Sequence, residues 1–342
     1  MRSTRWSRPW TRYWRPARGR STLAAQRSSP EPSARLPSRG GVRISTGVAQ
    51  AMRRGRPVVA LESSVLAQGL PRPANAEAAR RMIQAVTAAG AVPAVTAVVR
   101  GVPAAGLETR DLERFLEGDD ILKVSARDLA AAAADRRDGA TTVAAAIVLA
   151  HRAGIAVFAT GGIGGVHRGS RHDESADLVE LSRTPVIVVC SGAKAILDLQ
   201  ATAERLESLG VTVVGFRTET MPAFYSRESG IAVSVRVHTV DEVAEIYAAH
   251  RALGRPGALL VVQPPPPAAA LPARTVELAV SGGLRSAARA KVRGGAVTPF
   301  LLRAVVKATR GRALAANLAL LELNAGLAGK IAGAVALARN NR

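Results

Sequence analysis

The stretch TTVAAAIVLAHRAGIAVFATGG, residues 141–162, shows the unit from which this chain is built. Its first part repeats apolar residues at helical spacing and stops at Gly154, and glycine commonly ends helices. Its second part, IAVFATGG, is a short apolar run of the kind that forms a buried strand. A helix followed at once by a buried strand indicates an α/β fold.

The same alternation runs through most of the chain. Strand-like apolar runs occupy residues 56–63, 92–99, 121–125, 155–162, 185–192, 211–216 and 257–263. Helical patterns occupy residues 75–90, 109–118, 127–139, 141–154, 176–184, 193–210, 240–254 and most of 273–338. Strands that alternate with helices predict a parallel sheet covered on both faces. We therefore predict an α/β fold with a central, mainly parallel sheet flanked by helices, in a single large domain with a helical C-terminal part.

Residues 1–45 differ from the rest of the sequence. They hold 11 arginines and a single acid, Glu31, and so supply nearly half of the net charge of +21. They are rich in Arg, Ser and Pro and have little to bury, which predicts a disordered tail. An upstream-start artefact or plain tail, a targeting segment, and a nucleic-acid-binding arm all fit this composition. The folded domain is predicted to span residues 46–342.

Composition limits the class of protein. With 342 residues, 48% of them hydrophobic and 21% charged, the chain is predicted to be globular. No uncharged run of 18 apolar residues occurs, so we expect no membrane span. The single Cys190 excludes an internal disulfide and a cysteine zinc site, and it fits a cytoplasmic protein. Organelle targeting through the tail is the alternative.

Polar or glycine-rich segments follow one predicted strand after another. Glu62 follows the first strand, Lys123 ends another, and the segment GGIGGVHRG, residues 161–169, follows the run IAVFAT. Lys194 follows the strand at 185–192. Because ligands of such folds bind beyond the carboxyl ends of the strands, these segments predict a common site.

Lys194 is conspicuous because only five of the 47 basic residues are lysine. We predict that it lies in the first turn of a helix over 193–210, where the partial positive charge of the helix end favours the neutral amine. A neutral amine attacks carbonyl carbons, whereas arginine stays protonated. A nucleophilic or Schiff-base role and simple anion binding both remain open.

The other candidates can be interpreted as catalytic, binding or structural residues. Glu62 suits general acid/base catalysis if buried, or pairs with an arginine. Lys123 and the helix start at Thr142 suit phosphate binding, and so do the amides of the glycine-rich loop that carries His167. That loop is no dinucleotide fingerprint, because His167 stands where a third glycine is needed. An acidic cluster suits Mg²⁺ or Mn²⁺, or complements a helix N-terminus; its members are Asp173, Glu174 and Asp177.

Four long stretches then resemble the pseudouridine-5′-phosphate glycosidase family. They are VALESSVLAQGLPRPAN, DGATTVAAAIVLAHRAGIAVFATGGIGGVHRG, SADLVELSRTPVIVVCSGAKAILDL and PAFYSRESG, and the resemblance spans about 57 to 330. It implies reversible cleavage of the C–C glycosidic bond of pseudouridine 5′-phosphate to uracil and ribose 5-phosphate. It also implies a catalytic domain over 46–342, a homotrimer, and Mn²⁺ as the divalent metal.

The resemblance assigns a role to each candidate residue. It makes Lys194 the nucleophile that forms an imine with C1′, and Glu62 the proton donor and acceptor. Asp173 matches the metal ligand, in preference to Glu174 and Asp177. The residues expected to bind substrate are Lys123, Thr142, Val143, His167, Ser175, Ala176, Asp177 and Asn317.

Three departures from the family pattern bear on these roles. The spacer SRHDE, residues 170–174, is shorter than usual, Gln263 replaces an asparagine, and Leu323-Asn324 replaces an Asn-Asn pair. Two other functions stay open at this point. The first is another Schiff-base lyase acting on a sugar phosphate. The second is a basic RNA-binding protein that uses residues 1–45, and apart from this tail we expect no nucleic-acid binding.

Overall fold

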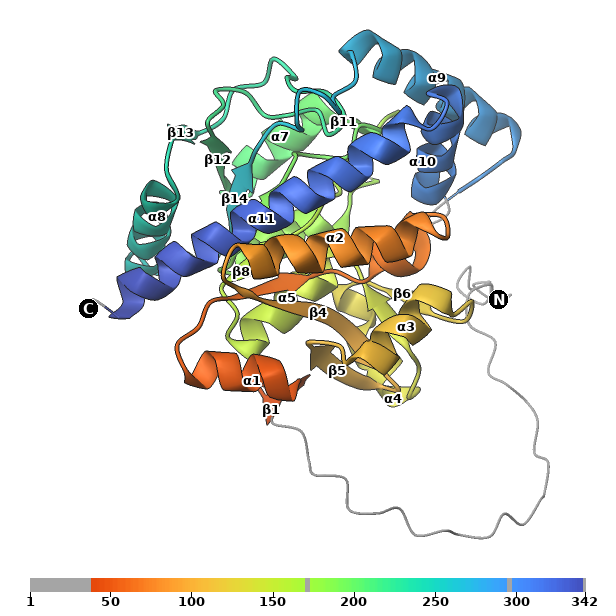
Figure 1. Cartoon of the computed structure of the whole chain (residues 1–342). Helices are drawn as coiled ribbons and strands as arrows, with labels where there is room; N and C mark the ends of the chain where they lie inside the picture. Colours follow the sequence, from red (N-terminus) through yellow and green to blue (C-terminus); the bar gives the residue numbers. More distant parts are fainter. Residues whose placement is uncertain (1–37, 170–172, 294–296, 341–342) are drawn as a thin grey trace, which may run out of the picture. The chain divides into compact units, whose positions relative to one another are not determined.

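The computed structural model describes residues 38–169, 173–293 and 297–340. Helices cover both faces of a twisted central sheet (Figure 1). The parallel strands of this sheet lie in the order β4 (Val92–Val99), β3 (Val58–Leu61), β8 (Val157–Ala159), β10 (Ile187–Cys190), β14 (Leu259–Val262), β12 (Thr212–Phe216) and β13 (Val235–Val237). The predicted fold class is confirmed.

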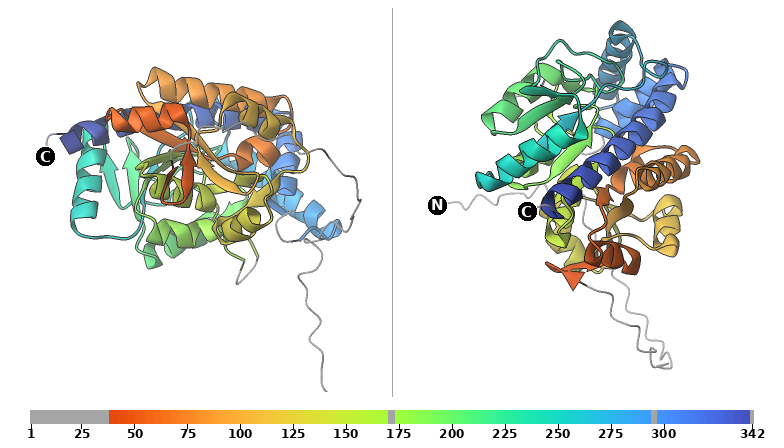
Figure 2. Two further views of the ribbon diagram at one scale, coloured as in Figure 1. Left: turned by 90° about the horizontal axis from the view of Figure 1, so that it is seen from below. Right: turned by 60° about the vertical axis from the view of Figure 1, so that its left-hand side comes forward.

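Two groups of helices complete the layers. Helix α11 (Arg312–Asn340) lies between α2 (Ala74–Ala88) and α8 (Val240–Ala252) and contacts β3, β8 and β10 (Figures 1 and 2). Helices α5 (Val143–Ala153) and α6 (Ala176–Arg183) pack against each other, and α5 contacts β3, β4 and β8. The remaining helices are α1 (Thr46–Arg53), α3 (Thr109–Glu117), α4 (Leu129–Ala134), α7 (Leu199–Ser208), α9 (Ala273–Arg289) and α10 (Val297–Ala308).

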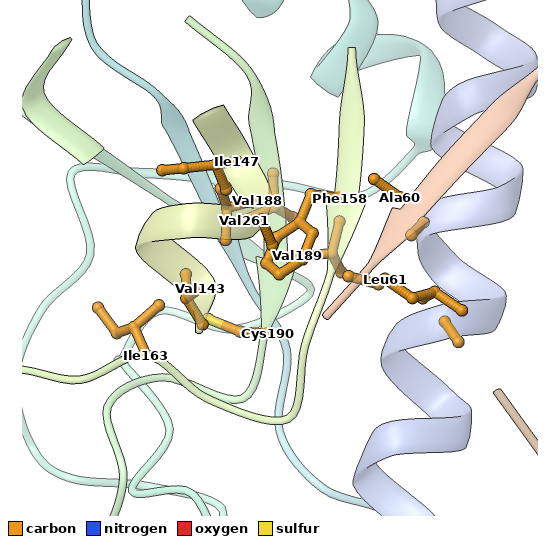
Figure 3. Close-up of a cluster of buried hydrophobic side chains, with 14 of the residues drawn as sticks. Ala60, Leu61, Val143, Ile147, Phe158, Ile163, Val188, Val189, Cys190 and Val261 are labelled. Atoms are coloured by element: carbon orange, nitrogen blue, oxygen red, sulfur yellow. The ribbon is translucent and has the colours of Figure 1, made fainter. Parts of the chain in front are cut away.

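The core lies between the central strands and these helices. Phe158, Val189 and Val261, from three neighbouring strands, gather beside Val143 and Ile147 of α5 (Figure 3). All five are at most 1% exposed. Removal of such side chains from water is the main stabilising contribution to a fold of this kind.

Burial in this core explains the apolar composition of helix α11 and the low reactivity of Cys190. By length and composition Arg312–Arg339 is apolar enough to cross a membrane, but 61% of its most apolar 18-residue segment is buried inside the protein. It serves as a core helix. Burial likewise raises the pKa of the Cys190 thiol to about 12, which leaves it protonated and unreactive.

One edge of the sheet departs from the predicted parallel pattern. Strands β5 (Val102–Ala105) and β7 (Gly139–Thr141) both pair antiparallel with β4, and β6 (Leu122–Val124) pairs with β7. The β4–β5 hairpin turns at Arg100 and Gly101, which both have positive φ. A Cβ on Gly101 would lie 2.6 Å from the Cα of Arg136, so only glycine fits there.

The predicted tail boundary at residue 45 is wrong for residues 38–45. Ser38–Arg39 form β1 and Val42–Ile44 form β2, which pairs with β5. Val42 and Ile44 are buried, and Ser45 caps α1 by accepting a hydrogen bond from the N–H of Val48. Two apolar side chains were too few to mark a strand in the sequence. Residues 1–37, on which the rest of the tail prediction falls, lie outside the described residues.

The predicted helix over 193–210 is also wrong in its first third. Residues 193–198 form a loop that ends in the short strand β11 (Leu197–Asp198), and α7 begins only at Leu199. Asp198 caps α7 by accepting from the N–H of Ala201. Ala193 and Ala195 favour a helix locally, but both are buried, as is Ile196. Tertiary packing overrides their propensity here.

The connections between the strands diverge between β3 and β8. After β3 the chain returns to β4 on one side, whereas after β8 it continues to β10 on the other. In open α/β sheets, ligands bind where the connections diverge, outside the carboxyl ends of the strands. We therefore expect the site to be formed by the residues that follow β3, β8 and β10.

Candidate active site

Glu62 directly follows β3 and is held by two hydroxyl groups. Ser64 Oγ donates to Glu62 Oε2 at 2.6 Å, and Thr160 Oγ1 donates to Glu62 Oε1 in a short hydrogen bond. Glu62 is 5% exposed and Thr160 only 1%. The carboxylate is thus oriented by neutral partners rather than by an arginine. Hydroxyl groups can donate or accept, so they suit both the charged and the protonated carboxyl group.

Lys194 lies in the loop between β10 and β11, one strand beyond Thr160. Its Nζ donates to the carbonyl oxygen of Gly162 at 2.7 Å, and its N–H donates to the carbonyl of Ile163 at 3.0 Å. Because Lys194 is not in a helix, the helix-end argument for its neutral amine does not apply. A carbonyl acceptor can bind an amine or an ammonium group, so this contact leaves the amine able to react.

The glycines at 161–165 are explained by tight packing. A Cβ on Gly162 would lie 2.6 Å from a ring carbon of Phe224, and one on Gly164 would lie 2.2 Å from Ser175 Oγ. The amides here also have protein partners: Ile163 N–H donates to Gly192, and Gly164 N–H donates to Asp177. The prediction that the loop amides bind an anion is wrong for these two groups.

Phe224 presses on both loops that carry the candidate residues. Its ring contacts the Cα side of Gly162, and its N–H donates to the carbonyl of Ser191 at 3.1 Å. It is 2% exposed and has a φ of 61°, in a region that bulky residues rarely adopt. Such strain persists only where the surroundings enforce it, and it often marks functional sites. Sequence reasoning missed Phe224 because no pattern signals a positive φ at phenylalanine.

Asp177 joins the glycine-rich loop to the start of α5. Its Oδ1 accepts from Ala144 N–H at 2.9 Å, and its Oδ2 accepts from Gly164 N–H at 2.8 Å. Ser175 caps α6 and accepts from the Asp177 N–H. Beside this junction the buried Oγ1 of Thr142 has no hydrogen-bond partner among the described residues. Because buried hydroxyl groups are normally paired, this orphan supports the predicted substrate contact at Thr142.

A buried trio of hydroxyl groups lies next to Glu62. Ser63 Oγ donates to the carbonyl of Thr96 at 2.7 Å, and Thr141 N–H donates to Ser63 Oγ at 2.9 Å. Thr96 Oγ1 and Thr141 Oγ1 are 2.9 Å apart, and all three residues are fully buried. The trio fixes the segment after Glu62 against the segment before Thr142, so the predicted acid/base residue and the predicted phosphate seat share one rigid support.

Lys123 belongs to the same site by its electrostatics. Burial among the surrounding groups lowers its pKa, and the positive charge of Lys194 lowers it further, while the charges of Glu62 and Asp177 oppose these effects. Lys123 is exposed to solvent, so this burial is only partial. Glu62, Asp177 and Lys194 are therefore near enough to Lys123 for their charges to act on it.

His167, Asp173 and Glu174 each have a polar or charged partner. His167 Nδ1 is 3.5 Å from Asp173 Oδ2, and Glu174 is paired with Arg205 at 2.9 Å. The side chain of Asp173 is 55% exposed. Asn317 of α11 lies beside Gly161, since a Cβ there would be 3.4 Å from its Oδ1.

The acidic cluster does not form a metal cage. Within residues 38–169, 173–293 and 297–340, no three His, Cys, Asp or Glu side chains are placed to hold an ion. The carboxylate of Glu174 forms a salt bridge with Arg205, and the carboxylate of Asp177 accepts hydrogen bonds from two backbone N–H groups. Asp173 has the most exposed carboxylate of the three, and such a carboxylate fits an ion that keeps most of its water shell, as Mg²⁺ and similar hard cations do.

The chain matches a family model described as indigoidine synthase A like protein over residues 47–334. A pseudouridine-5′-phosphate glycosidase of Gemmatimonas aurantiaca is 58% identical over 293 residues, which cover 86% of this chain and 96% of that protein. One of Staphylococcus aureus is 44% identical over 296 residues, again 86% and 96% of the two chains.

Two solved structures share the fold. The prealnumycin C-glycosynthase AlnA in complex with ribulose 5-phosphate has a TM-score of 0.82 and 39% identity, and the match covers 88% of this chain and 99% of that chain. An indigoidine synthase A-like protein of Thermotoga maritima has a TM-score of 0.76 and 41% identity, over 82% and 93% of the two chains.

Gly162→Ala is expected to destabilise the protein by about 1–3 kcal/mol, as overpacked sites commonly do. The added Cβ would lie 2.6 Å from the Phe224 ring and 2.9 Å from the carbonyl oxygen of Gly192. The measurement is the free energy of unfolding in urea. Gly47→Ala in α1 is the control, since nothing lies within 4 Å of its added Cβ. Equal stability of the two variants would contradict this packing.

Lys123 is expected to react with an acylating reagent several-fold faster than Lys291, Lys307 and Lys330 at mildly alkaline pH. All four are exposed, but the lowered pKa gives Lys123 a larger fraction of neutral amine. Mass spectrometry of partly labelled protein measures the relative rates. Lys194→Met removes one cause of the lowered pKa and should slow the labelling of Lys123. An equal or slower rate at Lys123 in the unaltered protein would refute the shift.

Proposed function

This chain belongs to the family of indigoidine synthase A like proteins, and we propose that it cleaves the C–C glycosidic bond of pseudouridine 5′-phosphate. The products are uracil and ribose 5-phosphate, and the reaction is reversible. Relatives up to 58% identical are named for this glycosidase activity, and the similar AlnA structure holds another five-carbon sugar phosphate. The observation that carries the proposal is the placement of Glu62 and Lys194 on either side of the carboxyl end of β8.

The proposed reaction needs both groups. Glu62 donates a proton to the ring oxygen as its bond to C1′ opens, and the neutral amine of Lys194 bonds to C1′. The nitrogen lone pair then forms an imine with C1′ while the bond from C1′ to C5 of uracil breaks and C5 gains a proton. Water hydrolyses the imine and regenerates the amine. A carbon-linked base has no heteroatom leaving group, which is why covalent catalysis by an amine is suited to this bond.

The surrounding residues suit a sugar phosphate. The ammonium group of Lys123, the unpaired hydroxyl of Thr142 and the start of α5 at Val143 together make an anion seat. We propose that the phosphate binds there, and that the segment Ser175-Ala176-Asp177 contacts the sugar. His167, in the glycine-rich segment, and Asn317, beside Gly161, complete the proposed set of substrate contacts.

Two further features of the function are proposed from the family resemblance. The first is a hydrated Mn²⁺ bound through the carboxylate of Asp173, which would supply a fixed positive charge near the site. The second is a homotrimer that acts in the cytoplasm. Light scattering on the purified protein tests the oligomeric state.

Purified protein with Mn²⁺ is expected to release uracil and ribose 5-phosphate from pseudouridine 5′-phosphate. Lys194→Arg should abolish turnover and borohydride trapping of the sugar, since arginine forms no imine. Glu62→Gln should lower kcat by about 100-fold or more, the usual contribution of general acid/base catalysis. Chromatography of uracil and mass spectrometry of the trapped protein are the measurements.

Lys330→Arg is the matched control, because it makes the same exchange at an exposed position of α11. It should leave both turnover and trapping unchanged. Full turnover by Lys194→Arg would refute the imine mechanism. Trapping of a sugar phosphate on Lys194 without release of uracil from pseudouridine 5′-phosphate would instead identify a different Schiff-base lyase.

Asp173→Asn is expected to weaken Mn²⁺ binding by at least about tenfold, the loss seen when even indirect partners of a metal are removed. Calorimetric titration with Mn²⁺ measures this without any enzymatic assay. Glu174→Gln is the control, because Glu174 is engaged by Arg205 and should not contribute to the affinity. If Glu174→Gln weakens binding and Asp173→Asn does not, the assignment of the ligand is wrong.

A further inference from the structure

Asn324 of α11 is a fully buried side chain that touches the ends of three strands. Its Nδ2 donates to the carbonyl of Thr160, after β8, at 2.9 Å. The same nitrogen is 3.2 Å from Ser191 Oγ, after β10. Its Oδ1 accepts from Nε2 of Gln263, after β14, at 3.0 Å. One amide group therefore connects the loops that follow three adjacent parallel strands.

One of these loops carries Lys194, and another holds Glu62 through Thr160. Thr160 presents its carbonyl to Asn324 and its hydroxyl to Glu62. Ser191 opens the loop that carries Lys194, and its N–H donates to the carbonyl of Gly161 at 3.0 Å. That same carbonyl is 3.4 Å from Nδ2 of Asn324. The next residue, Gly162, supplies the oxygen that holds the Lys194 amine.

Only an amide satisfies all of these neighbours at once. The carbonyl of Thr160 needs a donor, whereas Nε2 of Gln263 is itself a donor and needs an acceptor. An aspartate would offer acceptors only, and a leucine would leave the buried carbonyl of Thr160 without the donor that Asn324 supplies and take one of its two acceptors from Gln263. The chemistry of the site thus requires asparagine itself rather than any buried side chain of similar volume.

We propose that Asn324 is a positioning residue, which sets the distance between the Glu62 carboxyl group and the Lys194 amine by holding the ends of β8 and β10 together. It has no hydrogen bond to either group and acts through Thr160, Gly161 and Ser191. The inference rests on the proposed function and adds to it a residue of a C-terminal helix far from the site in sequence.

The test compares Asn324→Leu with Ile331→Ala. Ile331 is fully buried on the same helix, seven residues farther along, so its truncation destabilises the fold without touching the loops. Asn324→Leu is expected to lower kcat by about 10- to 100-fold, as small misplacements of reacting groups do, with KM changed less than kcat. Ile331→Ala should keep its kcat below its unfolding temperature. A kcat for Asn324→Leu equal to that of Ile331→Ala would overturn the proposal.

A double-variant cycle separates positioning from stability. If Asn324 acts through the segment that holds Glu62, then the kcat loss in Thr160→Val combined with Asn324→Leu should be smaller than the product of the two single losses. Independent, multiplicative losses would contradict the proposed route. Ser191→Ala removes one contact only and provides a milder variant in case Asn324→Leu does not fold.

The acylation rate of Lys194 relative to Lys330 tests the same positioning without substrate. Asn324→Leu should change this ratio several-fold because it releases the segment that presents Gly162 to the amine. Ile331→Ala should leave the ratio unchanged. An inactive but folded wild-type protein would refute the proposed glycosidase function alone, whereas an unchanged ratio in Asn324→Leu would refute the role of Asn324 alone.

Discussion

The register of three parallel strands is the constraint on which the site depends. Leu61 of β3 pairs with Ala159 of β8, and Ala159 pairs with Val189 of β10. The residues that directly follow Leu61 and Ala159 are therefore also side by side, and these are Glu62 and Thr160. A slip by one residue would turn every side chain to the opposite face of the sheet. The short hydrogen bond from Thr160 to Glu62 and the reach of Lys194 to Gly162 both follow from this alignment.

Close packing beyond the strand ends then fixes the positions of the residues that the strand register aligns. The glycines of the loop after β8 leave no room for side chains, and Phe224 fills the space against Gly162. Buried hydroxyl groups on one side and the Asn324 amide on the other satisfy the backbone there. Because dense interiors transmit small displacements, we expect these packed residues to affect the positions of Glu62 and Lys194.

Much of this arrangement was predictable from local patterns. The alternation of apolar runs and amphipathic helices located the buried parallel strands, because burial on both faces leaves a near-continuous apolar signature. It missed β13, whose first two residues are exposed. It placed Glu62 and Lys194 after strands, but the prediction that Lys123 ends a strand is wrong, because Lys123 is the middle residue of β6. It failed for residues 193–198, whose helix-forming alanines are all buried, and for β5 and β7, whose short antiparallel pairing depends on β4. The metal ligand and the substrate contacts remain predictions.

By itself the sequence determined the α/β class, the family and the candidate pair of Glu62 and Lys194, since periodicity and long motifs are local properties of the chain. The tertiary structure alone decided that hydroxyl groups orient Glu62 and that a carbonyl holds Lys194. It also decided that Asn324 reaches Thr160 across more than 160 residues of sequence. Contacts of this kind arise only when distant segments are packed together, and no spacing within one segment encodes them.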